Sequence, residues 1–270
     1  MVESDAVPPL IAVQQISRVF STASRTVTAL DNVTFDIQPG NFVAIVGPSG
    51  CGKSTLLKII SGLMPASFGT VTVAGHQVDR PLENVGMVFQ APVLLKWRSV
   101  LGNVLLPVEF AKLNVAHYAD KARALIKLVG LDGFEEMYPH ELSGGMQQRA
   151  SLCRALVTDP QLLLMDEPFG ALDAMTRDEL DMELLRIWEE RKKTVLFVTH
   201  SIQEAVFLSD LVFVMSARPG RLLETIAIDL PRPRTMEMMS TVKFGEYTLK
   251  IRALLASASD ATATGIGSTM

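Results

Sequence analysis

The chain has 270 residues, a formal net charge of −4 and 48% hydrophobic residues. This length allows one large domain or two small ones, and the apolar fraction excludes a wholly disordered chain. The mild acidity argues against a protein that coats nucleic acid, and no basic stripe is visible. The mean hydropathy is +0.27. The longest stretch without Asp, Glu, Lys or Arg, residues 59–78, contains a proline and three glycines, so we expect no membrane span.

The N-terminal residues show neither a basic region nor an apolar run, and we therefore expect no export signal. Two cysteines, Cys51 and Cys153, are too few for a disulfide framework in a chain of this length. A cytoplasmic location is the expectation that follows. No Cys/His spacing suggests structural zinc.

The first third of the chain predicts strands around a glycine-rich loop. Alternating apolar residues predict a strand over 33–37, and the continuous apolar run 42–46 predicts a strand buried on both faces. A helix is expected over 53–61, ending at Gly62. Further short strands are expected around Val71 and Val73, before an Ala74-Gly75 turn, and over 85–89.

From residue 91 onward, helical and strand-like patterns alternate. Helices are expected within 91–130 and over 174–192, and buried strands over 162–165 and 195–199. Strands at 212–215 and 222–228 and a last helix beyond Pro231 are expected to follow. Helical spacing predicts buried faces made of Tyr118, Ala122, Leu125, Ile126 and Val129 in the first helix, and of Leu180, Leu184, Leu185 and Trp188 in the second. This pattern predicts an α/β fold with a mostly parallel sheet and a helical insertion.

Residues 47–55 match the phosphate-loop pattern G-x-x-x-x-G-K-[ST], between a buried strand and a helix. They are Gly47, Pro48, Ser49, Gly50, Cys51, Gly52, Lys53, Ser54 and Thr55. Glycines let successive N–H groups turn inward around an anion, and the helix N-terminus adds its positive dipole end. Lys53 is expected to reach the β- and γ-phosphates, and the Ser54 hydroxyl to bind Mg²⁺. A strand-to-helix turn that binds nothing is the structural alternative.

The apolar run 162–165 ends in Asp166 and Glu167. The carboxyl end of a parallel strand is where α/β sheets bind ligands. Asp166 is therefore expected to hold Mg²⁺, and Glu167 to polarise an attacking water. His200 follows the next buried strand, so it is expected at the same edge, where a γ-phosphate contact competes with a structural role. These features predict a P-loop nucleotide hydrolase, and the absence of N-K-x-D from the sequence argues against a small GTPase.

Residues 142–149, Leu-Ser-Gly-Gly-Met-Gln-Gln-Arg, closely resemble the signature of ATP-binding-cassette (ABC) ATPases, with Met146 where the commonest form has Gln. Gln90 resembles the family's Q-loop glutamine, Ala171-Leu172-Asp173 its D-loop, and His200 its H-loop histidine. The resemblance covers 11–234 in order and spacing.

The resemblance implies a P-loop NTPase of ABC type: a mostly parallel sheet core with an antiparallel β subdomain and a helical subdomain at about 91–155. The ATPase domain would span 1–234, followed by a helical extension over 235–255 and a disordered tail over 256–270. ATP and Mg²⁺ are the implied cofactors. Gln90, Glu167 and His200 would be catalytic, with Gln90 also near the metal beside Ser54 and Asp166.

The family also implies a head-to-tail dimer of two copies of the chain, a C₂ arrangement. Ser143 can cap a helix whose first turn, Gly144-Gly145, is bare, which makes a second anion-binding helix start. This helix start, together with Asp173, would close on ATP held by the other copy. Phe20 stands where the family carries an aromatic residue that stacks on adenine, and a core phenylalanine is the alternative.

The segment after Gln90 bears on what the ATPase drives. In the family, a groove between the Q-loop and the helical subdomain receives a short coupling helix from a membrane subunit. The residues expected to contribute are Leu94, Leu95, Trp97 and Val100 as apolar contacts, with Lys96 and Arg98 at the rim. An internal core segment is the alternative for each of them.

The pattern L-L-x-W-R-x-V-L-x-N-V over 94–104, with S-A-R-P-G-R at 216–221 and D-L-P-R-P-R at 229–234, resembles the nitrate/sulfonate/taurine importer subfamily. This implies a bacterial importer ATPase, peripheral at the cytoplasmic face of the inner membrane, with two permease subunits and an extracytoplasmic solute-binding protein. Lys96 replaces the proline expected before Trp97, so importers of pyrimidine vitamin precursors remain an alternative. A non-transport ABC ATPase, such as an iron–sulfur cluster assembly subunit, is another.

Overall fold

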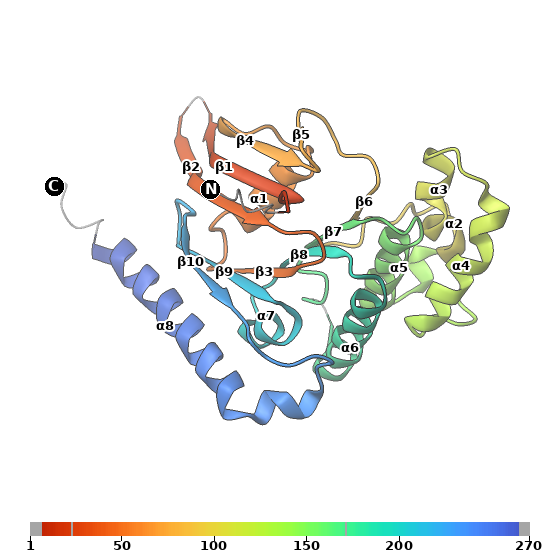
Figure 1. Ribbon diagram of the computed structural model, residues 1–270. Coiled ribbons are helices and arrows are strands. Elements are labelled where there is room, and N and C mark those ends of the chain that lie inside the picture. Colours follow the sequence, from red (N-terminus) through yellow and green to blue (C-terminus); the bar gives the residue numbers. More distant parts are fainter. Residues whose placement is uncertain (1–6, 23, 171, 265–270) are drawn as a thin grey trace, which may run out of the picture. The chain divides into compact units, whose positions relative to one another are not determined.

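The computed structural model describes residues 7–22, 24–170 and 172–264. Ala171 of the expected D-loop and residues 265–270 of the expected tail lie outside the described residues. The chain divides into two compact units (Figure 1). The first unit is made of Met1–Leu82 and Val198–Met270, and the second of Glu83–Phe197. The second unit is larger than the expected helical subdomain because it also contains strands and a long helix.

The first unit contains an antiparallel sheet in the order β2-β1-β4-β5. Its strands are β1 (Ile11–Ser21), β2 (Thr26–Ile37), β4 (Phe68–Val73) and β5 (His76–Gln77). Apolar residues alternate inward along β2, where Val33, Phe35 and Ile37 are buried. Ala74 and Gly75 have φ values of 51° and 78° and join β4 to β5, as the sequence predicts for a tight hairpin turn.

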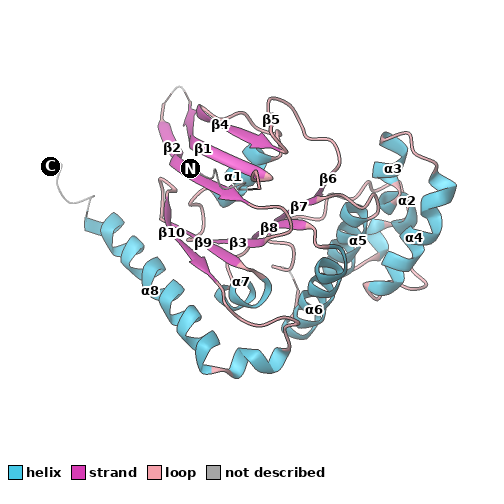
Figure 2. Ribbon diagram, viewed as in Figure 1, coloured by secondary structure: helices cyan, strands magenta, loops and turns pink. Residues whose placement is uncertain are grey.

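The first unit also contributes the strand run β10-β9-β3. β3 (Phe42–Val46) is parallel to β9 (Leu211–Met215), which is antiparallel to β10 (Leu222–Ala227). All five residues of β3 are buried, as its continuous apolar run predicts. Helix α1 (Lys53–Ile60) follows the glycine-rich loop after β3, and α7 (Ile202–Leu208) packs on β3 (Figure 2).

The C-terminal part of the first unit is helical. A short 3₁₀ turn, η2 (Met236–Ser240), precedes α8 (Val242–Thr264), which contacts α7 and β9. The helix continues through Thr264, so the described part of the expected tail, from residue 256, is helical rather than disordered. The preceding segment caps α7: Arg234 is 2% exposed and donates to the carbonyl oxygens of Val206 and Phe207 at 3.0 and 2.6 Å. This accounts physically for an arginine in D-L-P-R-P-R.

The second unit combines parallel strands with helices. β6 (Val85–Val88) is parallel to β7 (Leu162–Asp166), and β8 (Thr194–Val198) lies on the other side of β7. The helices are α2 (Val100–Val104), α3 (Leu106–Phe110), α4 (Val115–Leu128), the 3₁₀ turn η1 (Pro139–Glu141), α5 (Gly144–Leu156) and α6 (Ala174–Arg191). Helix α5 contacts β6, α2 and α4.

The predicted face of α6 is confirmed, and that of α4 is confirmed in part, because Tyr118 and Leu125 of α4 are only half-buried. Leu180, Leu184, Leu185 and Trp188 of α6 are all buried. In α4, Ala122 and Ile126 are fully buried, and Val129 just beyond its end is 3% exposed. Within residues 7–22, 24–170 and 172–264, no helix combines the length and the apolar character needed to cross a membrane.

Candidate nucleotide site

The glycine-rich loop begins where β3 ends at Val46, and α1 begins at Lys53. Gly50 and Gly52 have φ values of +74° and +110°, which residues with a side chain rarely adopt. A Cβ on Gly52 would lie 2.7 Å from the Leu30 side chain. The backbone can therefore follow this tight path only with glycine at these positions. The predicted order of buried strand, glycine-rich loop and helix is confirmed.

Lys53 places its ammonium group inside the curve of this loop. The side chain is only 5% exposed, and Nζ donates to the carbonyl oxygens of Gly47 and Pro48 at 2.8 and 3.0 Å. The N-cap of α1 is Gly52, which offers no side chain to the first N–H groups of the helix. A buried cation next to a helix N-terminus makes a binding place for an anion.

Cys51 fills space in the loop. It is 1% exposed, its Sγ lies 4.0 Å from Lys53 Nζ, and burial raises the pKa of its thiol. A thiol with a raised pKa is a poor nucleophile. Cys51 therefore has the environment of a small packing residue.

His200 follows β8 and is held next to the strand that leads into the loop. The N–H of Thr199 donates to Ile45 O at 3.2 Å, beside β3. The Thr199 hydroxyl donates to the buried Glu204 carboxylate and accepts from Ser201 N at 2.9 Å. His200 thus emerges at the carboxyl edge of β3, and its place at the edge of Asp166 and Glu167 stays a prediction.

Phe20 lies in β1 one residue before its end, rather than just after the strand. The residue is 36% exposed, with the Arg18 guanidinium carbon 4.8 Å from the centre of its ring. An aromatic ring that is exposed to this extent is not a core residue, so the core alternative is wrong. Stacking of Phe20 on a base stays a prediction.

In the second unit, Asp166 and Glu167 stand at the end of β7. Asp166 is 5% exposed, and Glu167 has a left-handed backbone with φ of 46°. Gln90, which follows β6, donates from Nε2 to Glu167 Oε2 at 3.2 Å. Non-glycine residues held at positive φ cluster at functional sites. The structure thus joins the expected Q-loop residue to the expected catalytic carboxylate.

The signature segment begins helix α5. Ser143 is its N-cap, and the Ser143 hydroxyl accepts from Met146 N at 3.2 Å. Ser143 and Gly144 are exposed, and a Cβ on Gly144 would meet nothing within 4 Å. The first turn of α5 therefore presents bare N–H groups to an approaching anion. Further along the same helix, the buried Gln148 donates to Phe89 O at 3.0 Å, next to Gln90.

Asp173 is the N-cap of α6. Its carboxylate accepts from the N–H and the hydroxyl of Thr176 at 3.1 and 2.8 Å, and these hydrogen bonds lower the pKa of Asp173. The structure gives Asp173 a local capping role. A contact with ATP held by another copy stays a prediction.

The second unit also carries an apolar groove of about 390 Å³ near α3. Its lining is Val85, Gly86, Met87, Phe89, Val93, Leu95, Leu106, Pro107, Phe110, Arg154, Ala155 and Thr158. Val93 and Phe110 are 55% and 79% exposed. Leu94 and Val100 were expected here, but they are 9% and 0% exposed. Their placement in the groove is wrong, because both side chains turn into the core.

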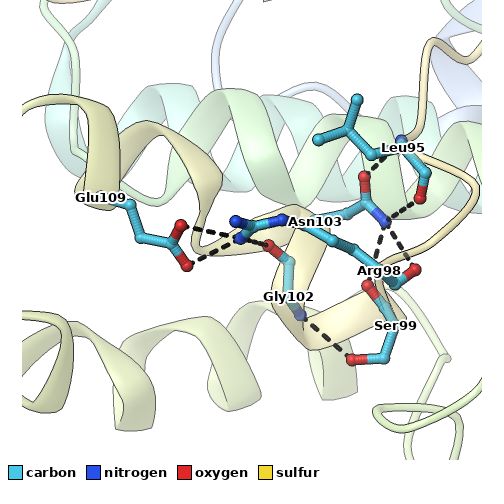
Figure 3. Close-up of polar contacts among 6 residues, drawn as sticks. All are labelled: Leu95, Arg98, Ser99, Gly102, Asn103 and Glu109. Carbon is cyan, nitrogen blue, oxygen red and sulfur yellow. Dashed lines mark hydrogen bonds and ion pairs between the residues drawn. The ribbon is translucent and has the colours of Figure 1, made fainter.

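Asn103 shapes the segment beside this groove (Figure 3). It is fully buried, accepts from Leu95 N at 2.7 Å and donates to the carbonyl oxygens of Leu95, Arg98 and Ser99 at 3.0–3.1 Å. Arg98 bonds both oxygens of Glu109 at 2.8 Å, and that hydrogen bond lowers the pKa of Glu109. This network leaves Trp97 at 73% exposure. It explains the arginine and the asparagine of the 94–104 pattern.

The sequence-predicted site residues therefore fall into two groups. The first unit carries Phe20, the glycine-rich loop with Lys53 and Ser54, and His200. The second unit carries Gln90, Asp166 and Glu167, the signature residues Ser143, Gly144 and Gly145, and Asp173. Sequence reasoning did not assign roles to Asn103, Gln148 or Arg218. All three belong to motifs that stand out in the sequence: Asn103 to the 94–104 pattern, Gln148 to the 142–149 signature and Arg218 to S-A-R-P-G-R.

A glycine-rich loop with a buried lysine at a helix start, on an α/β fold with an acidic strand end, defines a P-loop nucleoside triphosphatase. The sequence model of the ABC transporter family matches residues 30–170 of this chain.

Similar proteins agree with this class. The protein MJ0412 of Methanocaldococcus jannaschii, described as an ABC transporter ATP-binding protein, is 47% identical over 245 residues, 91% of either chain. The taurine import ATP-binding protein TauB of Rhizobium johnstonii is 46% identical over 241 residues, 87% of this chain and 92% of its own. The aliphatic sulfonates import ATP-binding protein SsuB of Bacillus cereus is 45% identical over 225 residues, 83% of this chain and 88% of its own.

Among solved structures, a dimeric post-hydrolysis state of the ATP-binding cassette MJ0796 bound to ADP and Pi is similar, with a TM-score of 0.73. It is 29% identical, and the match covers 82% of this chain and all of that one. The chain therefore belongs to the ABC transporter family, as an ATP-binding subunit with ATPase activity.

Proposed function

We propose that this chain energises uptake of a small solute of the nitrate/sulfonate/taurine class, as a pair of identical subunits bound to two integral-membrane permease subunits. The observation that carries the proposal is the similarity, over most of the chain, to aliphatic sulfonate and taurine import subunits. The setting would be the cytoplasmic face of a bacterial inner membrane, with an extracytoplasmic solute-binding protein supplying the solute.

ATP would bridge the two copies of the chain. Its phosphates would be neutralised by Lys53 in one copy and by the bare start of α5 at Ser143 in the other. The capped, exposed first turn of α5 and the buried Lys53 ammonium support this arrangement. Hydrolysis removes the γ-phosphate from the bridge and weakens it, so the pair opens.

The donor types of the chain fit Mg²⁺. The proposed ligands are the Ser54 hydroxyl, the Asp166 carboxylate and the Gln90 amide oxygen, all hard oxygen donors. Within the described residues, no group of three or more His, Cys, Asp and Glu side chains could hold a metal ion by itself. Mg²⁺ is typically bound through one or two carboxylates together with waters and substrate phosphates, so a set with a single carboxylate suits it. Bound there, the ion would neutralise charge on the phosphates.

Glu167 is the proposed general base, which takes a proton from the attacking water. Gln90 holds one of its carboxylate oxygens and so fixes its orientation. His200 is proposed to contact the γ-phosphate, and Phe20 to stack on the adenine. Such stacking contributes about 1–3 kcal/mol and tolerates any base.

The groove beside α3 is the proposed binding site for a coupling helix of the permease. It is apolar, and its lining includes the exposed Val93 and Phe110. An amphipathic helix would bury its apolar face there. A cluster-assembly ATPase would bind soluble partners instead of a permease. The identity of the protein that binds this groove therefore distinguishes the two proposed functions.

The test is co-purification of the tagged chain with a multi-span permease expressed with it. We expect Phe110→Ser to lose the permease while its basal ATP turnover stays near wild type. Phe68→Ser is the matched control, because Phe68 is similarly exposed, at 68%, but lies in β4 of the first unit. Retention of the permease by Phe110→Ser, or ATPase stimulation by soluble partners only, would contradict the proposal. Binding assays with the cognate receptor would then separate sulfonates from pyrimidine precursors.

A further inference from the structure

The loop between β9 and β10, residues 216–221, touches the phosphate loop at two successive peptides. The guanidinium of Arg218 donates from Nε and Nη2 to the Gly50 carbonyl oxygen at 3.1 and 2.8 Å. Two residues further on, a Cβ on Gly220 would lie only 2.1 Å from Cys51 O. The S-A-R-P-G-R motif therefore does more than turn the chain between two strands.

This loop is anchored independently of the phosphate loop. The backbone of Gly220 bonds β2 on both sides, through Ala29 O at 2.9 Å and Asp31 N at 3.0 Å. Arg221 forms an ion pair with Asp31 at 2.5 Å, and its N–H donates to Ser216 Oγ at 2.9 Å. The backbone that carries Arg218 is thus fixed to the sheet, which restricts where its side chain can lie.

The contact fixes the orientation of one peptide unit in the loop. In a trans peptide the C=O and the following N–H point in opposite directions. Because Arg218 holds the Gly50 carbonyl, the Cys51 N–H is directed away from Arg218. There it donates to Pro48 O over 3.3 Å, a long hydrogen bond that an approaching phosphate oxygen can replace.

We propose that Arg218 is a positioning residue for the nucleotide phosphates, which holds the Gly50–Cys51 peptide so that its N–H faces the phosphate-binding side. Lys53 cannot do this once nucleotide binds, since its ammonium, now on Gly47 O and Pro48 O, is needed by the phosphates. Arg218 bonds the Gly50 carbonyl oxygen, which points away from the Cys51 N–H of the same peptide. It can therefore keep this hydrogen bond while nucleotide is bound.

The inference rests on the proposed nucleotide role of the phosphate loop, and the experiment separates the two. Nucleotide dissociation constants and steady-state kinetics would be measured for Arg218→Ala, Arg218→Lys and Arg221→Ala. Arg221→Ala is the matched control: it removes the same charge from the same loop, its guanidinium binds Asp31 rather than the phosphate loop, and the backbone hydrogen bonds of Gly220 to β2 still anchor the loop without it. Lys53→Ala reports on the loop assignment itself.

We expect Arg218→Ala to weaken ATP and ADP binding about ten- to hundredfold, the scale of one lost charge-assisted hydrogen bond. KM for ATP should rise by about the same factor as the dissociation constant. The change in kcat should be much smaller, because the substitution leaves the reacting groups in place. Arg218→Lys should recover part of the loss. The defect should persist in high salt, since a hydrogen bond at contact distance is screened less than a remote charge.

Two results would overturn the inference. One is that Arg218→Ala and Arg221→Ala bind nucleotide equally well and have equally lowered melting temperatures. Arg218 would then have only a structural role. The other is a defect that vanishes in high salt and is fully rescued by lysine, which would show attraction by charge alone. Normal nucleotide binding by Lys53→Ala would instead refute the assignment of the loop.

Discussion

Gln90 donates a hydrogen bond to Glu167 at 3.2 Å, although the two residues are 77 positions apart in the chain. Each follows a parallel strand, β6 and β7, whose carboxyl ends meet at one edge. Glu167 adopts a left-handed backbone conformation, with φ of 46°. Such a conformation costs roughly 1–3 kcal/mol and persists only where the surroundings enforce it. This pair therefore holds a carboxylate in a defined orientation at the strand edge.

The first prediction concerns the carboxylate itself. Glu167→Gln keeps the side-chain size but removes the proton acceptor, so ATP binding should remain while turnover falls by about 10²–10⁴-fold. ATP should then trap the chain as a dimer, measurable by size-exclusion chromatography beside an ATPase assay. Near-normal turnover would exclude Glu167 as the general base.

Lys53→Ala should weaken nucleotide binding. The ammonium group is buried within the phosphate loop, and loss of its charge-assisted contacts should cost about 10–100-fold in ATP affinity. Equilibrium binding of a fluorescent ATP analogue measures the effect. Lys58→Ala is the control, since Lys58 lies in the last turn of the same helix. Equal affinities of the two variants would contradict the assigned role.

Two substitutions at Ser143 distinguish its role as the N-cap of α5 from its proposed contact with phosphate. Ser143→Ala should cost about 1 kcal/mol of stability through loss of the α5 N-cap. Ser143→Asp should keep the cap, since aspartate caps as well as serine, but its charge should repel the phosphate of a second copy. We therefore expect Ser143→Asp to unfold like wild type in urea and to lose ATP-dependent dimerisation. Dimers of normal stability would argue against a phosphate contact at this helix end.

Asn103→Ala should destabilise the fold strongly. The substitution leaves the half-buried backbone partners of Asn103 in the 95–99 segment without these hydrogen bonds, at a cost of roughly 2–4 kcal/mol. Asn114→Ala, which removes only the exposed cap of α4, should cost about 1 kcal/mol or less. Urea unfolding compares the two variants. A cost for Asn103→Ala no larger than that for Asn114→Ala would show that the network contributes little.

Much of the fold could be predicted because its signals are local. The apolar runs of β3, β7 and β8 read directly as buried strands, and the structure places them within a residue or two of the predicted bounds. Positive φ at Gly50, Gly52 and Gly62 follows from residue type in a turn. The phosphate loop and the strand-end acids are contiguous motifs, so they predicted a P-loop nucleotide hydrolase, and the resemblance of the 142–149 signature implied the ABC family.

The groove segment shows why the remainder could not be predicted. Leu94, Leu95, Trp97 and Val100 are all apolar and lie within seven positions of one another. Which of them faces the core depends on Asn103, whose side chain folds the backbone of 95–99 around itself. A pattern of apolar residues carries no information on such a turn, because the turn has no regular period.

The sequence by itself determined the class of chemistry, since phosphate binding needs glycine, lysine and hydroxyl groups at fixed short separations. Only the tertiary structure decided which distant groups support that chemistry. Arg218 reaches Gly50 across 168 positions, and Gln90 reaches Glu167 across 77. The physical reason is that a hydrogen bond between side chains of different elements depends on how the strands pair and where their loops emerge, and no local pattern encodes that pairing.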